Sequence, residues 1–361
     1  MTTVTPQNVG QLLADARRAR QTGDVPALAR LADALLAYQP HEPRFLVLKG
    51  DALHAGGDLR SATTFYGAAV ARVQGATQLP PDLRADIEHA LRRQAEAAAL
   101  FEARLRDGLR ERGFDAADPD QSRFAAAVDL MTGRRRLYYQ QPKFFLFPGL
   151  PQIEFQPRAT VPWLAQVEEA TADIKAELQG LLARPELFAP YIEDRKNRPA
   201  SDQAGLLGND DWSAVFLWKD GIEVPEIAAL CPRTLQALSG LPLCRIPGRS
   251  PSILFSRLKA GAKIPPHTGL INTRLICHLP LVVPDGCYFR VGNEERQWRE
   301  GQAWAFDDTI EHEARNDSAQ DRTILIFDVW KPEITPAERQ KICDLFATID
   351  AAGGSNIKLG V

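Results

Sequence analysis

The stretches TRLICHLPLVV (273–283) and TILIFDVW (323–330) decide the fold of the C-terminal part of this chain. Both are short, apolar and rich in β-branched residues, as expected of buried strands. Similar runs surround them, namely WSAVFLW (212–218), SILFSRL (252–258), CYFRV (287–291) and QAWAF (302–306). The spacing of these strands predicts an all-β barrel or sandwich. Amphipathic helices are predicted over 161–182 and from about Pro336 onward.

The first hundred residues have a different pattern. Residues 8–112 are rich in Ala, Leu, Arg and Glu, with apolar positions at helical spacing. Gly23-Asp24 recurs 34 residues later as Gly57-Asp58, which is the period of tetratricopeptide repeats. Small residues follow in the second copy, at Gly50, Ala62 and Ala69, whereas the first copy has Leu28 where a small residue is expected. The prediction is a degenerate tetratricopeptide-like domain, and a plain helical bundle is the alternative.

A chain of 361 residues favours two domains. We predict an α + β protein with an N-terminal helical repeat domain over 1–113 and a connector over 114–144. The segment FDAADPDQS (114–122) has the composition of a break between them. A double-stranded β-helix of the jelly-roll or cupin-like type then occupies 145–361.

The composition points to an ordinary globular protein, with 45% hydrophobic and 25% charged residues. A net charge of −3 argues against general nucleic-acid binding, and the arginine run 134–136 does not change this. The sequence shows no signal peptide and no apolar run long enough to span a membrane. Five cysteines without a CxxC pair fit free thiols in the cytoplasm.

Two histidines lie at the ends of predicted strands. His267 in IPPHTG precedes the run around 275–283, and His312 in FDDTIEHEARN precedes TILIFDVW. Strands distant in sequence meet in a double-stranded β-helix, so both imidazoles could bind one Fe(II) and leave positions open for a keto acid and O2. Arg322 on the following strand could bind the far carboxylate of such a keto acid through its planar fork. A surface pair of Arg322 with Asp321 is the alternative.

About 130 residues between Trp212 and Arg339 resemble the aspartyl/asparaginyl β-hydroxylase family. The resemblance lies in the stretches WSAVFLWKDG (212–221), ILFSRLKAGAKIPPHTG (253–269), NTRLICHLPLVVP (272–284), WREGQAWAFDDTIEHEARN (298–316) and ILIFDVWKPEITPAER (324–339). Upstream, KFFLFPGLPQIEF (143–155) is similar to the entry segment of bacterial members. The resemblance implies a 2-oxoglutarate-dependent dioxygenase that uses Fe(II) and O2.

Residue by residue, the resemblance implies that His267 and His312 are the iron ligands. Most related oxygenases have an acid two residues after the first histidine, but this family does without it, and Gly269 stands there. Arg322 matches the arginine for the distal carboxylate of 2-oxoglutarate. The other implied co-substrate positions are Ser256 and His278.

Arg274 matches one of two arginines in its segment of the family, and Ile276 replaces the other. Structural pairing remains an alternative for both Arg274 and His278. Asp307 and Asp308 are close to His312 in sequence, yet the family pattern uses them to fix the loop rather than to bind metal.

The implied reaction is hydroxylation of the β-carbon of an aspartyl or asparaginyl residue in a peptide or protein, which the helical repeats could dock. The alternatives are the same chemistry on a small metabolite, a lipid-linked acyl chain or a carrier-bound amino acid. A catalytically inactive binding or scaffold protein, and a cupin-type metalloenzyme with a denser ligand set, are further alternatives.

Overall fold

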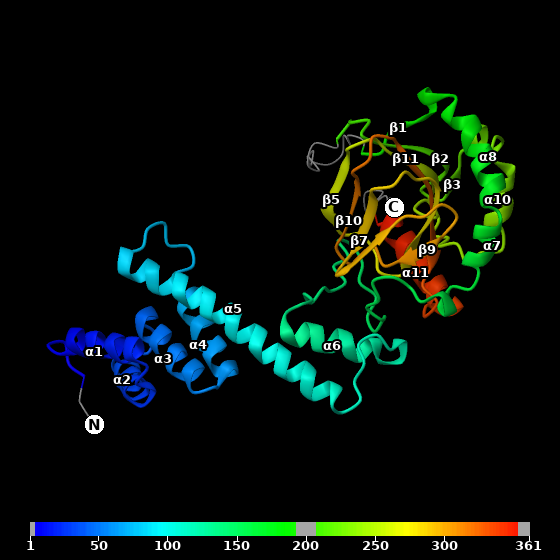
Figure 1. Cartoon of the computed structure of the whole chain (residues 1–361). Coiled ribbons are helices and arrows are strands. Elements are labelled where there is room, and N and C mark those ends of the chain that lie inside the picture. The colour runs from blue at the N-terminus through cyan, green and yellow to red at the C-terminus, as the bar shows by residue number, and fades with distance from the viewer. Residues whose placement is uncertain (1–3, 193–206, 353–361) are drawn as a thin grey trace. The chain divides into compact units, whose positions relative to one another are not determined.

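The computed structural model describes residues 4–192 and 207–352. The chain forms two compact units, residues 1–135 and 136–361 (Figure 1). The division between Arg135 and Arg136 falls inside the segment 114–144 that the sequence analysis names as the connector. Each unit has its own hydrophobic core.

The first unit begins with two helical hairpins. Their helices are α1 (Val9–Thr22), α2 (Val25–Tyr38), α3 (Pro43–Ala55) and α4 (Leu59–Arg72). Helices α1 and α3 start 34 residues apart, as do α2 and α4. The two Gly-Asp pairs form the turns between the helices of each hairpin. Gly23 and Gly57 both have positive φ, which glycine adopts without strain. The side chains of Asp24 and Asp58 cap α2 and α4.

Small residues allow the second hairpin to close. A Cβ atom at Gly50 would lie 2.5 Å from the ring of Tyr66 on α4, so only glycine lets the two helices approach this closely. Ala62 and Ala69 are fully buried in the same core. The unit ends with α5 (Pro81–Arg110), the short η1 (Pro119–Gln121) and α6 (Ser122–Thr132). Helical structure over the first hundred residues is confirmed, whereas the tetratricopeptide class remains a prediction.

The second unit contains two antiparallel sheets (Figure 1). The first has seven strands in the order β1-β2-β4-β11-β6-β9, with β3 paired to β2, and the second has the order β5-β10-β7-β8. The strands are β1 (Ala189–Pro190), β2 (Trp212–Lys219), β3 (Ile222–Glu223), β4 (Ile253–Leu258), β5 (Lys263–His267), β6 (Arg274–Val282), β7 (Cys287–Val291), β8 (Glu294–Gln297), β9 (Trp304–Phe306), β10 (His312–Asn316) and β11 (Arg322–Trp330). This arrangement confirms the predicted jelly-roll type of fold.

Helices cover the outer face of the larger sheet. They are α7 (Leu164–Glu169), α8 (Thr171–Leu182), α9 (Pro225–Ala228) and α10 (Pro232–Leu238), and short η2 (Arg158–Thr160) and η3 (Pro185–Leu187) flank α7 and α8. Leu164, Ile174 and Leu178 pack there against Phe255 and Phe327. The helix predicted over 161–182 is thus divided into α7 and α8 at Ala170.

Between the two sheets lies a separate cluster of buried side chains. It includes Ala214, Leu254, Ile276, Phe289 and Ile324. Helix α11 (Pro336–Ala351) starts where the sequence predicts and is capped by Thr335 and Glu338. No helix in the described ranges is long and apolar enough to cross a membrane.

Candidate active site

His267 and His312 are cross-strand partners. His267 is the last residue of β5 and His312 the first of β10, and the two are paired directly in the antiparallel register. Their ring centroids lie 4.1 Å apart. The structure therefore brings together two imidazoles that are 45 residues apart in the chain, close enough to bind one ion through bonds of about 2 Å.

The backbone fixes which nitrogen of each ring is available. The Nδ1 atom of His267 lies 2.8 Å from the carbonyl oxygen of Pro265, and that of His312 lies 3.0 Å from the carbonyl of Ile310. Since a carbonyl can only accept, both Nδ1 atoms carry the proton, and each Nε2 keeps its lone pair. This is the tautomer that a metal-binding histidine needs.

Burial also favours the neutral form of both rings. It lowers the pKa of His267, an effect to which the nearby charge of Lys143 adds. The pKa of His312 lies well below its ordinary value because of burial, with His267 contributing. Neutral imidazoles are the form that coordinates a cation.

The carboxylate of Asp308 occupies the space beside Gly269. A Cβ atom at Gly269 would lie 2.1 Å from Oδ2 of Asp308, and the amide of Gly269 donates to the carbonyl oxygen of Asp308 at 2.7 Å. Burial raises the pKa of Asp308 to about 6. Position 269 is therefore closed to any side chain while Asp308 stays in place.

Arg274 holds Asp308 from the interior. Its Nη2 lies 3.4 Å from Oδ2 of Asp308, and its Nη1 lies 3.2 Å from Oδ2 of Asp328 on β11. The guanidinium is completely buried. These two ion pairs favour the structural alternative for Arg274 over contact with a co-substrate.

Both carboxylate oxygens of Asp307 accept hydrogen bonds from other side chains. It accepts from Nζ of the buried Lys331 at 2.5 Å and from the side chain of Gln140 at 2.7 Å. The hydroxyl of Thr309 donates to its other oxygen at 2.6 Å. Asp307 therefore fixes the loop before His312.

Arg322 is buried without a carboxylate partner among the residues that the structure describes. It starts β11, and its exposed fraction is 1%. Its Nη1 donates a long hydrogen bond of 3.4 Å to the backbone carbonyl of Ser256, and its Nε has no partner. Burial lowers its pKa to about 10. A buried cation in this state is stabilised by binding an anion. The alternative prediction, a surface ion pair of Arg322 with Asp321, is wrong because Arg322 is buried.

Ser256 and His278 lie on the strands beside β11. Ser256 on β4 pairs with Ile324, and its hydroxyl accepts from Nε1 of Trp212 at 3.0 Å. His278 on β6 pairs with Ile326, and its Nδ1 has no hydrogen-bond partner in the part of the chain that the structure describes. Burial lowers the pKa of His278 well below its usual value, and both Arg322 and His312 add to the effect. His278 is thus near the arginine and the histidine pair at once.

Aromatic rings that the sequence analysis did not assign surround His278. Phe289 and Phe306 each have a ring centroid 4.9 Å from that of His278, and Trp298 and Trp304 follow at 6.0 and 6.4 Å. Only their spacing along strands marks these residues in the sequence, and that signal is the same for core packing. In the described residues, no group of three His, Cys, Asp or Glu side chains is placed to hold a metal ion.

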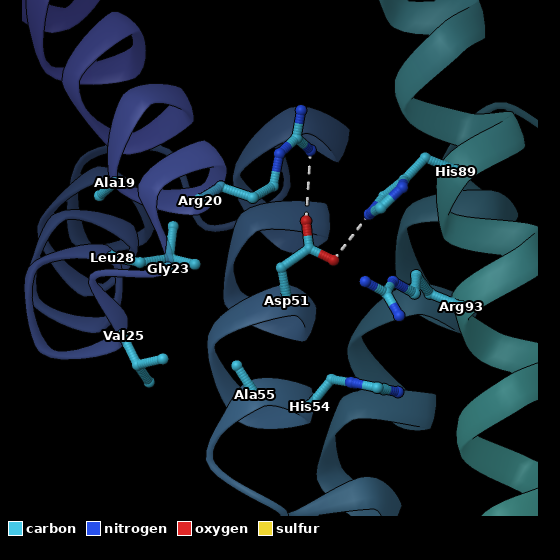
Figure 2. A pocket seen from close by; sticks show the side chains of 10 residues that line it. All are labelled: Ala19, Arg20, Gly23, Val25, Leu28, Asp51, His54, Ala55, His89 and Arg93. Atoms are coloured by element: carbon cyan, nitrogen blue, oxygen red, sulfur yellow. Dashed lines mark hydrogen bonds and ion pairs between the residues drawn. The ribbon is translucent and has the colours of Figure 1, made fainter.

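A second polar cluster lies in the helical unit (Figure 2). It borders a cavity of about 90 Å³ that is lined by residues of α1, α2, α3 and α5. The carboxylate of Asp51 accepts from Tyr66 at 2.7 Å and pairs with Arg20 at 3.2 Å and with His89 at 2.8 Å. These contacts lower the pKa of Asp51 despite its burial.

Comparison with known families assigns the segment that contains the histidine pair. Residues 168–332 match the family model described as aspartyl/asparaginyl beta-hydroxylase. This segment is therefore similar to the aspartyl/asparaginyl β-hydroxylase family. The family resemblance inferred from the sequence motifs is thereby confirmed.

Three relatives show the range of the family. The human aspartyl/asparaginyl beta-hydroxylase is 34% identical over 185 residues, which cover 50% of this chain and 24% of that protein. The human aspartate beta-hydroxylase domain-containing protein 2 is 30% identical over 58% of this chain and 55% of its own length. An ornithine lipid ester-linked acyl 2-hydroxylase of Rhizobium tropici is 34% identical over 50% of this chain and 61% of its own length.

The chain thus spans only about a quarter to three fifths of the length of these relatives. Solved structures similar to the chain include the cupin domain of Schizosaccharomyces pombe Cnp3. It is 10% identical, covers 37% of this chain and 71% of that chain, and has a TM-score of 0.24. The fold assignment rests on the strand order and not on this weak similarity.

Proposed function

We propose that the second unit is an Fe(II)- and 2-oxoglutarate-dependent dioxygenase. The observation that carries the proposal is the paired arrangement of His267 and His312, whose available Nε2 atoms lie in neighbouring rings. Imidazole nitrogen is a suitable ligand for Fe(II), and a two-residue set leaves positions open for other ligands. Bound iron would supply the activation of O2, which no amino-acid side chain can provide.

The co-substrate would bind deeper between the sheets. Arg322 offers a buried guanidinium without a counter-ion among the described residues, which suits the distal carboxylate of 2-oxoglutarate. Ser256 and His278 flank Arg322 on the neighbouring strands and offer polar atoms for the co-substrate.

Asp308 and Arg274 would position the metal site from outside. Asp308 fills the space next to Gly269, where other oxygenases carry a ligating acid, and Arg274 holds it there. The proposed protein ligands are therefore two imidazoles alone. The role of the loop 307–309 would be to keep His312 in register with His267.

The substrate we propose is an aspartyl or asparaginyl residue of a peptide or protein, hydroxylated at its β-carbon. The match to the family model and the name of the similar human protein support this choice. The helical unit would dock that partner, since stacked helix pairs form surfaces suited to peptides.

A second substrate class has its own support. The Rhizobium relative is named for hydroxylation of an acyl chain. Ile276, which replaces one of the two arginines of the family pattern, is buried in the apolar cluster between the sheets. An uncharged wall at that position would suit an acyl chain better than a carboxylate.

The cytoplasm is the compartment we propose. All five cysteines, at 231, 244, 277, 287 and 343, are unbridged in the structure. Burial raises the pKa of the Cys231 thiol to about 12, so this group would be unreactive toward mild oxidants. Free thiols of this kind are usual in reducing compartments.

Two measurements test the proposal. Calorimetry with Mn(II), which binds such sites without supporting turnover, should detect 2-oxoglutarate binding that disappears in His312→Ala. Succinate formation with Fe(II) should then rise when the true substrate is added. The substrate screen has two arms. One tests peptides that contain Asp or Asn, and the other tests acyl lipids such as ornithine lipids. Absence of 2-oxoglutarate binding in the metal-loaded protein would refute the dioxygenase assignment.

A further inference from the structure

Four buried nitrogen atoms that have no hydrogen-bond partner among the described residues lie in one part of the second unit. They are Nε of Arg322, Nδ1 of His278 and the indole Nε1 atoms of Trp298 and Trp304. Each of these side chains is at least nine-tenths buried. Leaving a buried donor without a hydrogen-bond partner destabilises the free protein. Three of the four, Nε of Arg322 and the two indole nitrogens, are donors, and such a group in one place indicates a ligand that accepts hydrogen bonds.

Trp298 lies directly against the buried arginine. The guanidinium carbon of Arg322 is 4.5 Å from the centroid of the Trp298 ring. Trp298 follows β8, and its amide donates to the carbonyl of Cys287 at 3.2 Å, which anchors the residue to β7. Its ring is supported by Phe289 at 5.3 Å and stacks with Trp304 at 6.0 Å and 17°. The indole is thus held rigidly, and its N–H is exposed to neither solvent nor protein acceptors among the described residues.

A carboxylate needs more donors than Arg322 alone supplies. An ionised carboxylate accepts at about four lone-pair sites, and a guanidinium fork satisfies about two of them. The hydroxyl of Ser256, which already accepts from Trp212, can donate one further bond. This leaves a place for another neutral N–H, and a neutral donor adds no charge that would have to be desolvated.

We propose that the indole N–H of Trp298 is a further donor to the distal carboxylate of the co-substrate, beside Arg322. The inference rests on the proposed dioxygenase function and makes Trp298 a specificity-determining residue. In this role, Trp298 favours 2-oxo acids with a second carboxylate over 2-oxo acids that end in a methyl group. A pocket that hydrogen-bonds a polar group rejects the analogue without it, because the donors of the pocket are then left unpaired.

The experiment compares two ligands in the full-length protein loaded with Mn(II). Calorimetry gives the dissociation constants of 2-oxoglutarate and of 2-oxovalerate, in which a methyl group replaces the distal carboxylate. Trp298→Phe keeps an aromatic ring against Arg322 but removes the N–H. We expect the affinity for 2-oxoglutarate to fall about tenfold, equivalent to about 1.4 kcal/mol, with the affinity for 2-oxovalerate unchanged.

The matched control is Trp163→Phe. Trp163 is partly buried and packs on the outer face of the larger sheet, with its ring centroid 6.3 Å from that of Phe327. This variant should bind both ligands as the unmodified protein does. Equal losses for the two ligands in Trp298→Phe, or no loss for either, would overturn the proposal. If the unmodified protein binds neither ligand, the dioxygenase proposal fails together with this one, and that result is distinct from a failure of Trp298 alone.

A second measurement needs no variant. In ¹⁵N-tryptophan-labelled protein with diamagnetic Zn(II), a new hydrogen bond to a carboxylate should move one indole N–H resonance when 2-oxoglutarate is added. Adding 2-oxovalerate should leave that resonance in place. Indole resonances that respond identically to the two ligands would overturn the assignment even if Trp298→Phe failed to fold.

Discussion

The two units differ in whether a buried charged side chain has partners within the protein. In the helical unit, Asp51 has three partners within 3.2 Å, Tyr66, Arg20 and His89. Figure 2 shows the contacts with Arg20 and His89. In the second unit, among the described residues, Arg322 has one long hydrogen bond to a backbone carbonyl, and its Nε has no partner. The first cluster is complete in the protein alone.

This difference separates structural polar clusters from sites that bind a ligand. Removing a buried charge that has partners destabilises the fold, because those partners are then left unpaired. An unpartnered one destabilises the free protein and gains its partner on binding. Both clusters contain histidine and arginine, so residue type alone does not distinguish them.

The largest effect is expected from the histidine pair. His267→Ala or His312→Ala removes one of the two proposed iron ligands, and decarboxylation of 2-oxoglutarate should fall below detection. His89→Ala, in the helical unit, removes a histidine of the partnered cluster and should leave turnover unchanged. Succinate formation measures all three. Substantial turnover in either of the first two variants would place the metal elsewhere.

Arg322→Met should separate binding from stability. Loss of the charged hydrogen bonds should weaken 2-oxoglutarate binding by about a hundredfold. The ligand-free protein should be no less stable than the original, because an unpaired buried charge has been removed. Arg322→Lys should restore binding only in part, since an ammonium cannot reproduce the planar fork. Calorimetry and denaturant unfolding check these outcomes, and an unchanged dissociation constant for 2-oxoglutarate would remove the assignment.

Asp51→Asn tests the partnered cluster in the same way. The change removes the charged partner of His89 and one of the two carboxylates near Arg20, which keeps Asp86 at 3.7 Å. We expect the helical unit to lose about 2 kcal/mol of unfolding free energy. Affinity for 2-oxoglutarate should not change. A variant as stable as the original would show that the three contacts of Asp51 contribute nothing net, and the contrast with Arg322 would then be lost.

The smallest effect concerns the two equivalent turns. Asp24→Ala and Asp58→Ala each remove a side chain that caps a helix, and each should cost about 1 kcal/mol. Equal losses in thermal unfolding would support a repeated hairpin. A loss at only one of the two positions would favour a plain helical bundle.

Much of the fold was predictable because many strands are long and apolar. Strands β2, β4, β6 and β11 all match runs named from the sequence. Strands β5, β8 and β10 were not predicted. KIPPH contains two prolines, which are tolerated because β5 is an edge strand, and the charged EERQ and HEARN lie on the partly exposed sheet. Local sequence does not encode such tertiary pairing.

The candidate site was less accessible to sequence reasoning. His267 and His312 could be named because family motifs frame them, but their tautomers depend on the carbonyls of Pro265 and Ile310. The partners of Arg274 come from two other parts of the chain. A tryptophan such as Trp298 has the same apolar signature whether it packs or binds, and only the absence of an acceptor for its N–H among the described residues distinguishes the two roles.

The prolines of β5 also restrict how a substrate can approach. Peptides often bind by adding a strand to an open sheet edge, which requires backbone N–H donors along that edge. Pro265 and Pro266 lack this hydrogen, and they directly precede His267. An extended polypeptide therefore cannot form a continuous ladder along this edge. Recognition along this edge must depend on side chains, and the same feature prevents two copies of the protein from pairing through β5.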